Sequence, residues 1–448
     1  MNNYQKFLHQ KTQLSGDFGF DPVWMPDILF PFQESLVEWS CRKGRAAIFA
    51  DCGLGKTGMQ LTWAENVARK SGGRVLILTP LAVAFQTVQE GEKFGVESIY
   101  RREGIQEADR IVVTNYERLH YFSPSDFSGV VCDESSILKG FDGATRAAVT
   151  EFMRTIPYRL LCTATAAPND YIELGTSSEA LGHLERKHML TRFFTHDSGE
   201  TAKWRLKGHA RSRLFWRWMC TWARAVRKPS DLGFDDAGFD LPELITRNHT
   251  VQAAKPRNGY LLDVPAVGLD DQREDLKNTL KERCGLAADI INGHDQPAVA
   301  WCNLNAEGDL LRKLIPDAEQ VSGSDKEERK EEVFKNFIQG NIRVLVSKPK
   351  IAGFGLNMQH CNHQTFFPSH SFEQYYQAVR RCWRFGQKRP VTIDMIGTDG
   401  QDNVIRNLRH KQNQAEEMFK ELIGHMSKEL QIETTQKPTK QEELPSWI

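Results

Sequence analysis

The feature that most constrains this fold is a strand, a glycine-containing loop and a helix that follow one another near the start of the chain. Residues 45–49 (RAAIF) are a short apolar run typical of a buried strand. The loop ADCGLGKT follows, and the apolar spacing of residues 57–70 predicts a helix that ends at Gly72 and Gly73. A strand, loop and helix in this order are typical of a phosphate-binding loop.

The residues of this loop match the chemistry that a nucleotide triphosphate needs. Glycines let the backbone wrap the phosphates, Lys56 can meet the β and γ oxygens, and the hydroxyl of Thr57 can bind Mg²⁺. The first position of the pattern is Ala50 instead of glycine. We therefore expect an ATP and Mg²⁺ site whose loop residues are Gly53, Leu54, Gly55, Lys56 and Thr57.

Two acidic residues directly follow a later apolar strand pattern, GVVC. An ATPase needs one carboxylate to hold the metal and a second to orient the attacking water. Asp133 is the candidate metal ligand and Glu134 the candidate for orienting water. The alternative is a solvated acidic turn, but an apolar strand that ends in Asp-Glu within an α/β pattern favours the catalytic interpretation.

Strand and helix patterns alternate twice along the chain, which predicts an α/β fold of two lobes. Each lobe should be a mostly parallel sheet covered by helices, with a helical insertion between the lobes. In the first lobe the strand patterns are 45–49, 75–78, 111–114, 130–132 and 159–163, and in the second they are 298–302, 344–347, 365–367 and 391–396. The predicted units are a first lobe at 1–168, a mostly helical insertion and linker at 169–250, a second lobe at 251–400, and C-terminal helices with a mobile tail at 401–448.

Composition excludes several other classes of protein. With 448 residues, the chain is long enough for two or three domains with sizeable cores. No stretch approaches the roughly 18 apolar residues of a membrane helix, and the first residues lack a secretion signal, so a cytoplasmic location is expected. The formal net charge of zero argues against a protein that simply coats nucleic acid.

The nine cysteines are scattered without a C-x-x-C pair, so neither a disulfide framework nor a zinc ribbon is indicated. His360, Cys361 and His363 lie close together in sequence. Two histidines and one cysteine in a short loop rarely complete a four-ligand site, so we do not expect a metal there.

One segment is strongly basic and aromatic. Residues 201–230 contain no Asp or Glu, and they carry four tryptophans (204, 216, 218 and 222) among the basic side chains. Basic groups release counterions from phosphates and rings can stack on bases, so Arg213, Arg217 and Arg224 are candidate nucleic-acid contacts. The alternative is equally open: the tryptophans are core anchors and the basic groups a solvated face.

Taken in order, these motifs resemble those of superfamily 2 helicases, particularly the compact Swi/Snf-like members found in bacteria and their phages. PFQ (31–33) resembles the upstream motif whose Gln reads adenine, which would be Gln33 here. DCGLGKT and DESS resemble motifs I and II, and TAT (163–165) resembles motif III, which couples ATP to nucleic acid. The resemblance implies RecA-like lobes, and it implies nucleic-acid backbone contacts in motifs Ia and Ib, at Thr79, Pro80, Thr114 and Tyr116.

The second lobe carries the remaining motifs. AGFGLN (352–357) resembles motif V, which implies that Gly353 and Gly355 bind the nucleotide. QAVRRCWRFGQ (377–387) resembles motif VI, which implies a catalytic role for Gln377. By resemblance Arg381 and Arg384 are arginine fingers that reach the γ-phosphate. Ser135 and Ser136 depart from the residues that follow Asp-Glu in the best-known subfamilies, which leaves the subfamily open.

The sequence thus predicts an ATP-dependent helicase or translocase that acts as a monomer on nucleic acid, with DNA favoured over RNA. One alternative is a double-strand DNA translocase that does not separate strands. Another is an ATP-gated clamp with slow hydrolysis. A phage-encoded chain would work in the host cytoplasm, and the terminal LPSWI is either an unstructured end or a docking peptide for a protein partner.

Overall fold

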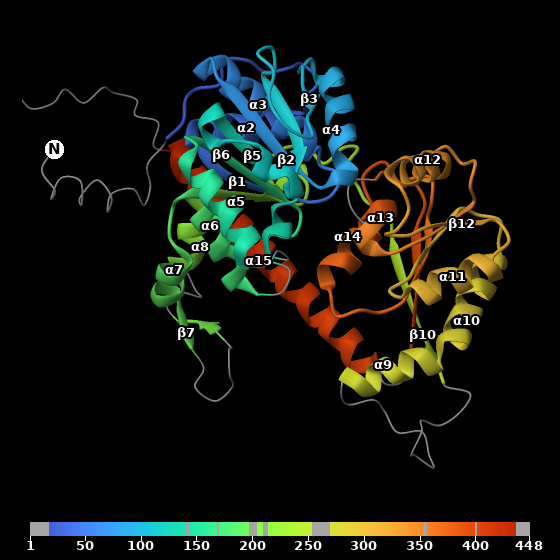
Figure 1. The fold of residues 1–448 in the computed structure, drawn as a ribbon. Coiled ribbons are helices and arrows are strands. Elements are labelled where there is room, and N and C mark those ends of the chain that lie inside the picture. The colour runs from blue at the N-terminus through green and yellow to red at the C-terminus, as the bar shows by residue number, and fades with distance from the viewer. Residues whose placement is uncertain are drawn as a thin grey trace, which may run out of the picture.

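The computed structural model describes residues 18–139, 143–167, 170–196, 204–208, 214–252, 269–352, 356–398 and 401–435. Two α/β lobes lie side by side, and one long helix at the C-terminal end runs from the second lobe back to the first (Figure 1). Two lobes built on parallel sheets confirm the predicted fold class. No helix among the described residues is long and apolar enough to cross a membrane.

The first lobe is built on a seven-stranded sheet in the order β3-β4-β2-β5-β6-β1-β9. Every pairing in it is parallel. The strands are β1 (Arg45–Ala50), β2 (Arg74–Thr79), β3 (Ile99–Tyr100), β4 (Ile111–Asn115), β5 (Phe127–Cys132), β6 (Tyr158–Thr163) and β9 (Ala223–Val226). Because both faces of the sheet are covered, its central strands are continuous apolar runs rather than alternating ones.

Successive residues of each strand enter two different cores. Ile48 and Ile77 pack on one face beneath three helices, α2 (Pro31–Lys43), α3 (Lys56–Ser71) and α4 (Leu81–Phe94). Phe49 and Leu78 point the other way, toward α5 (Gly143–Thr155), α6 (Leu174–Leu181), α7 (Arg186–Phe193) and α8 (Phe215–Cys220). The period of two along each strand therefore sets the layers of this lobe.

The second lobe has a six-stranded sheet in the order β10-β15-β14-β11-β13-β12, again with parallel pairings. Its strands are β10 (Leu244–Val251), β11 (Ala298–Trp301), β12 (Ala318–Val321), β13 (Val344–Ser347), β14 (His363–Phe366) and β15 (Val391–Thr398). Its helices are α9 (Leu269–Asn278), α10 (Leu280–Asn292), α11 (Asn305–Leu314), α12 (Glu327–Ile338), α13 (Pro349–Ala352) and α14 (Phe372–Cys382). Figure 1 shows α14 on the side of this lobe that faces the first lobe.

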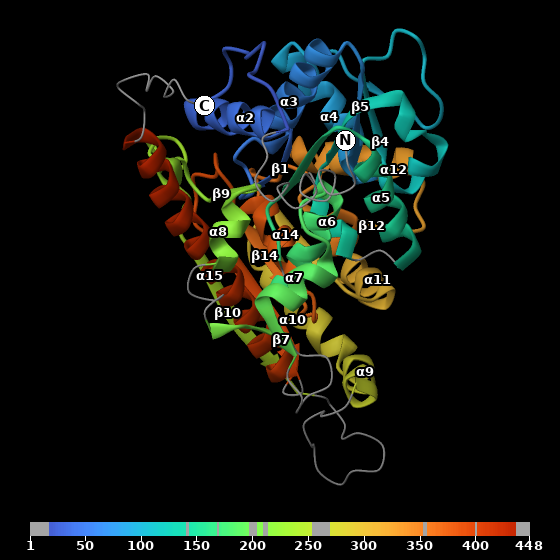
Figure 2. The same ribbon diagram turned by 90° about the vertical axis from the view of Figure 1, so that its left-hand side faces the viewer.

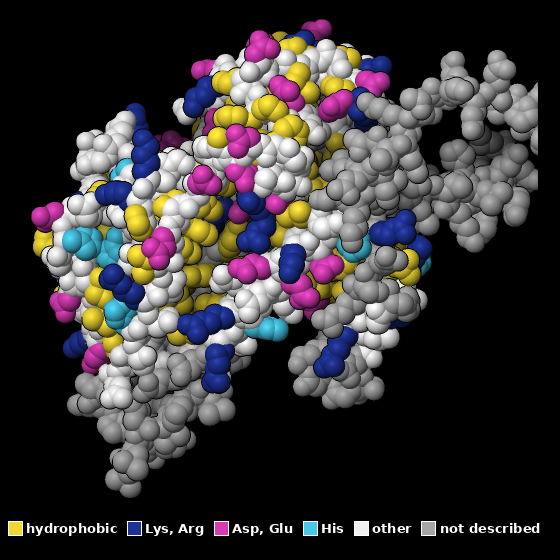
Figure 3. Space-filling view, turned by 180° about the vertical axis from the view of Figure 1, so that it is seen from behind, with side chains coloured by type: hydrophobic (Ala, Val, Ile, Leu, Met, Phe, Trp, Pro, Cys, Tyr) yellow, Lys and Arg dark blue, Asp and Glu magenta, His cyan; other side chains and the backbone are white. Residues whose placement is uncertain are grey.

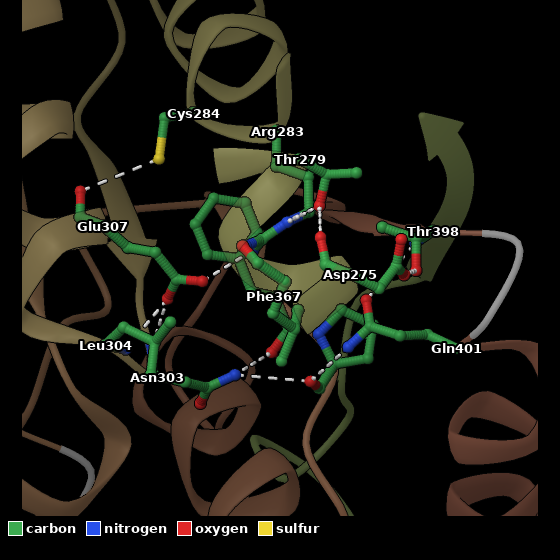
Figure 4. Close-up of polar contacts among 12 residues, drawn as sticks. Asp275, Thr279, Arg283, Cys284, Asn303, Leu304, Glu307, Phe367, Thr398 and Gln401 are labelled. Atoms are coloured by element: carbon green, nitrogen blue, oxygen red, sulfur yellow. Dashed lines mark hydrogen bonds and ion pairs between the residues drawn. The ribbon is translucent and has the colours of Figure 1, made fainter. Parts of the chain in front are cut away.

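A buried ion pair fixes α10 against α11 in the second lobe (Figure 4). Arg283 Nη1 lies 2.6 Å from Glu307 Oε1, and both side chains are fully buried. The other carboxylate oxygen of Glu307 accepts from the backbone N–H groups of Asn303 and Leu304 at the start of α11. Such a pair is tolerated in a core because each charge has its partner and further hydrogen bonds.

Helix α15 (Asp402–Thr435) belongs to both lobes. Leu408 packs in the core of the second lobe, whereas Met418, Phe419 and Leu422 enter the core of the first. Figure 2 shows α15 running alongside α8. We predicted one or two helices here with a mobile tail from residue 427, but the helix continues to Thr435, and residues 436–448 with LPSWI lie outside the described residues.

The segment between the lobes differs from the mostly helical insertion that we expected. Besides α6, α7 and α8 it contains a hairpin of β7 (Phe194–His196) and β8 (Trp204–Leu206), and then β9, which pairs with β1 in the first sheet. β10 begins the second sheet at Leu244, inside the range assigned to the linker. Arginine and tryptophan around the short run of β9 concealed its strand character in the sequence.

Candidate nucleotide site between the two lobes

The loop between β1 and α3 has the backbone of a phosphate-binding loop. Gly53 and Gly55 have φ values of 90° and 75°, in the left-handed region that glycine enters without strain. A Cβ atom on Gly55 would come within 2.3 Å of Gln33 Nε2, so a larger residue there would also displace the Gln33 amide. Leu54 is buried beneath the loop, and the first N–H groups of α3 lie where an anion is stabilised.

Lys56 and Thr57 lie at the first turn of α3. Lys56 Nζ donates to the carbonyl oxygens of Ala50 and Asp51, at 3.0 and 3.3 Å. Thr57 is half-buried and borders the same cavity as Lys56. These two residues therefore supply the ammonium and the hydroxyl that the sequence predicted for the phosphates and for Mg²⁺.

Asp133 follows β5 and is held from three sides. Gln60 Nε2 donates to its Oδ1 at 2.6 Å, and Thr79 Oγ1 donates to its Oδ2 at 3.2 Å. The hydroxyl of Tyr116 donates to its backbone oxygen at 2.6 Å. A carboxylate fixed in this way is suited to hold a metal ion in one position.

Glu134 has a strained backbone and an incompletely satisfied side chain. Its φ of 48° is left-handed, and among the described residues no other non-glycine has a positive φ. Such strain costs about 1–3 kcal/mol and is typical of functional sites. Burial raises the pKa of Glu134, Lys56 opposes that rise and Asp133 adds to it, while Oε2 has no hydrogen-bond partner. These properties suit a carboxylate that orients water.

Arg381 and Arg384 of the second lobe face these groups across a cavity of about 130 Å³. The cavity is bordered by the phosphate loop, Asp133 and Glu134 on one side, and by Asn357 and the two arginines on the other. Arg381 donates to the backbone oxygens of Gln377 and Leu356. Burial and the nearby charge of Arg381 lower the pKa of Arg384 to about 10, so an anion in the cavity would relieve an unfavourable charge.

Gln33 and Gln377 are positioned differently from what the motifs suggested. Both ends of the Gln33 amide are engaged, because Nε2 donates to Leu54 O at 2.8 Å and Oε1 accepts from Phe30 N at 3.0 Å. In this conformation Gln33 supports the loop instead of presenting a free amide to adenine. Gln377 is buried, and neither atom of its amide has a hydrogen-bond partner.

The residues predicted to touch the nucleic-acid backbone are mostly hidden, which corrects that expectation. Thr79, Pro80, Thr114 and Tyr116 are all buried, and Thr79 and Tyr116 instead hold Asp133. The hydroxyls of Thr79 and Tyr116 therefore serve the nucleotide side of the lobe. Thr165 of motif III donates to Glu373 of α14 at 3.4 Å and so links the two lobes.

The basic and aromatic segment is also largely packed into the core. Arg224 is 5% exposed, donates to Cys220 O at 2.6 Å and lies over the ring of Trp39, so it is withdrawn as a nucleic-acid contact. Trp216, Trp218 and Trp222 are buried, as the core-anchor alternative predicted. Arg217 is exposed. Arg213, like Gly353 and Gly355 of motif V, lies outside the described residues.

Two groups of site residues were missed by the sequence reasoning. Gln60 holds Asp133, and an ion pair joins Asp51 of the phosphate loop to Arg380 of α14. An acidic residue inside the glycine loop and a third arginine beside Arg381 were the available signals for the ion pair. Gln60 gave no signal, because nothing local distinguishes it from other polar residues of α3.

The part of the chain that the structure describes contains no group of three or more histidine, cysteine, aspartate or glutamate side chains that could hold a metal ion. His363 is engaged in a hydrogen bond, since its Nε2 lies 2.7 Å from Asp394 Oδ2. Cys361 Sγ donates to the backbone oxygens of Pro297 and His363. Of the three residues His360, Cys361 and His363, the last two are therefore engaged in hydrogen bonds.

Residues 287–386, from α10 through the arginines that face the cavity, match the family model of the helicase conserved C-terminal domain. This match confirms the predicted helicase resemblance for the second lobe. Among solved structures, the Sulfolobus solfataricus SWI2/SNF2 ATPase core in complex with double-stranded DNA is similar, at 16% identity. The match covers 84% of this chain and 89% of that one, with a TM-score of 0.42. No curated protein sequence matches this chain.

Proposed function

We propose that this chain is a nucleic-acid-stimulated ATPase that couples ATP hydrolysis between its lobes to movement on nucleic acid, with DNA favoured over RNA. The observation that carries the proposal is the cavity in which Lys56 and Glu134 of the first lobe face Arg381 of the second. Neither lobe alone contains both sets of groups, so turnover depends on closure of the lobes.

The buried polar groups fit ATP and Mg²⁺. Lys56 and the N–H groups at the start of α3 would hold the phosphates, and Thr57 and Asp133 would hold the metal ion, which neutralises charge on the phosphate oxygens when bound. The unpartnered Oε2 of Glu134 is placed to accept a hydrogen bond from the attacking water. The unpartnered Nε of Arg384 and the charge of Arg381 would meet negative charge on the γ-phosphate.

Binding of a whole nucleotide requires movement of the lobes. A cavity of about 130 Å³ is smaller than the roughly 300–1,000 Å³ of typical ligand sites. The lobes must therefore separate to admit ATP and close again to bring both arginines to it. Repeated closure and reopening would shift the grip of the two lobes along a strand.

Nucleic acid would meet a surface of mixed charge. The face in Figure 3 carries basic and acidic side chains interspersed, and its described part has no extended basic surface. Contacts on this face would therefore be local. Arg217, which is exposed, is a candidate contact among the described residues. A double-strand DNA translocase without strand separation remains the nearest alternative, and a clamp with slow hydrolysis is the alternative of another class.

One set of assays separates these possibilities. ATPase rates are measured with single-strand DNA, duplex DNA, forked DNA and RNA, and strand displacement is measured on the fork. A motor shows stimulated turnover, a duplex translocase shows it without displacement, and a clamp shows little steady-state turnover at saturating nucleic acid. Absence of stimulation by all four would refute the motor.

Replacement of Glu134 tests the site itself. Glu134→Gln keeps the shape of the side chain but removes the charge that orients water, so turnover should fall by about 100-fold or more. Binding of ATP should persist, because Lys56 and the loop are unchanged. Measured turnover near that of the wild type, with normal ATP binding by fluorescence, would contradict this role for Glu134.

A further inference from the structure

A buried ion pair connects the phosphate loop directly to the second lobe. Arg380 Nη2 lies 2.6 Å from Asp51 Oδ2, and Arg380 also donates to Cys52 O at 3.2 Å. The side chains of Arg380 and Asp51 are only 1% and 8% exposed. Each charge has lost most of its hydration and depends on the other for compensation.

The neighbours of this pair fix both partners. The hydroxyl of Tyr376 and the N–H of Cys52 donate to Oδ1 of Asp51. Burial raises the pKa of Tyr376, as does the charge of Asp51, so the hydroxyl keeps its proton at neutral pH. The guanidinium of Arg380 lies 4.8 Å from the ring centroid of Trp383, whose Nε1 donates to Pro242 O in the segment between the lobes.

Burial of Arg380 opposes its charge, but Asp51 and Tyr376 more than offset this and raise the pKa of the guanidinium. Arg380 is therefore charged in the closed arrangement, and Asp51 compensates that buried charge. If the lobes separate, Asp51 loses its buried partner and must be solvated by water instead. The pair is thus specific to the closed arrangement.

Asp51 in turn sets the position of Lys56. Its backbone N–H donates to Val226 O at 2.9 Å, and its backbone oxygen accepts from Lys56 Nζ at 3.3 Å. The cavity between Lys56 and Arg381 is not bordered by Asp51, Tyr376 or Arg380. The three residues border a second cavity between the lobes, so we expect their effect on the groups around Lys56 to pass through the loop, whose Cys52 borders both the pair and the first cavity.

We propose that Asp51, Tyr376 and Arg380 form an inter-lobe latch that positions the phosphate loop when the lobes close. The effect of the latch on turnover rests on the proposed ATPase function. Its role in holding the lobes together is independent of that function. Its members are positioning residues, distinct from Arg381 and Arg384, which border the cavity. Closure is thereby coupled to the phosphate loop through contacts separate from those of the arginine fingers.

The first test is a double-mutant cycle on turnover. Asp51→Asn or Arg380→Gln alone leaves one buried charge unpaired on closure, so kcat with saturating nucleic acid should fall by about 30-fold. KM for ATP should change by less than about threefold, because the groups bordering the cavity remain. The double variant carries no unpaired charge and should recover to within about fivefold of the wild type. If the decreases in kcat of the two single variants instead multiply in the double variant, the two residues act independently and the latch is overturned.

The chain offers a matched control in a second ion pair between the lobes. Arg102 Nη2 lies 3.5 Å from Glu327 Oε2, but these side chains are 59% and 48% exposed. Exposed pairs contribute little, so Arg102→Gln should change kcat by less than about twofold. A loss as large as that of Arg380→Gln would mean that any inter-lobe charge matters and would remove the special role of Asp51.

The second test does not depend on ATP hydrolysis. Exposed Lys70 and Lys313 lie in different lobes, and the nine native cysteines are buried, so K70C and K313C can carry a fluorescent donor and acceptor. Energy transfer in the nucleotide-free protein should fall when Arg380→Gln is added and return when Asp51→Asn is combined with it. Unchanged transfer would overturn the latch. A normal response in a protein without ATPase activity would support the latch and count against the proposed function alone.

Discussion

Two regions of this chain are rich in arginine and tryptophan, yet they face different surroundings. In and just after α14, Arg380 pairs with Asp51 across the lobe boundary, and Arg381 and Arg384 border the nucleotide cavity. In the α8–β9 region, Arg224 donates to Cys220 O within its own lobe, and Trp222 is fully buried. Composition is similar in the two regions. The element packed opposite each one decides whether its arginines face a ligand site or support a core.

The largest expected effect lies in α14. Arg381→Ala removes a charge that only the transition state uses fully, so nucleic-acid-stimulated kcat should fall by about 1,000-fold or more. Thermal unfolding should shift little, because the side chain donates only to two backbone oxygens. Arg312→Ala, an exposed arginine of the same lobe, is the control and should retain turnover. If Arg381→Ala instead unfolds the protein, the contrast between the two regions disappears.

The next effect concerns pH and the core around Trp222. His183 stacks on that ring, and burial lowers its pKa from 6.5 to about 4. In the unfolded chain the imidazole takes up a proton at higher pH than in the folded protein. The contribution of neutral His183 to the free energy of unfolding is therefore fully present above about pH 6.5. As pH falls toward 4, up to about 3 kcal/mol of that free energy is lost.

Replacement of His183 should flatten this dependence. Urea unfolding of the wild type and of His183→Gln, measured at intervals between pH 4 and 7, gives the difference in slope. If the free energy of unfolding of the variant depends on pH as steeply as that of the wild type, other groups cause the acid sensitivity. His183 would then not be buried against the core of the α8–β9 region.

The smallest expected effect is the loss of nucleic-acid binding at Arg217, and it contrasts with the loss of stability expected at Arg224 in the same region. Arg217→Glu, at an exposed position, should weaken nucleic-acid binding a few-fold and reduce the salt dependence of log affinity by about 1. Arg224→Glu should instead lower the free energy of unfolding by about 3 kcal/mol or more, because it buries an unpaired carboxylate. Equal binding losses with equal stability in both variants would restore Arg224 to the binding surface.

Much of the fold was predictable from local patterns. The apolar runs at 75–78, 130–132 and 344–347 became central strands, because buried parallel strands are apolar on both faces. β3, β9, β10 and β12 were missed. All four are edge strands, and their short or polar sequences carry no clear periodic signal. The hairpin of β7 and β8 was missed for the same reason.

At the nucleotide site, the sequence motifs identified the phosphate loop and the charged residues, but not the hydrogen bonds that these residues make. Lys56, Asp133 and Arg381 border one cavity as their motifs implied. The motif resemblance placed Thr79 and Tyr116 on nucleic acid, whereas the packed lobe turns both toward Asp133. The hydrogen bonds that engage Gln33 were equally invisible in the sequence.

By itself, the sequence determined that a glycine loop with Lys56 and an acidic strand end at Asp133 would be built in one α/β lobe, because backbone conformation and strand burial are local properties. Only the tertiary structure decided that α14 docks on that loop and that Arg380 neutralises Asp51. The physical reason is that a buried charge is stable only beside its partner. Here that partner lies more than 300 positions away along the chain, on the other lobe.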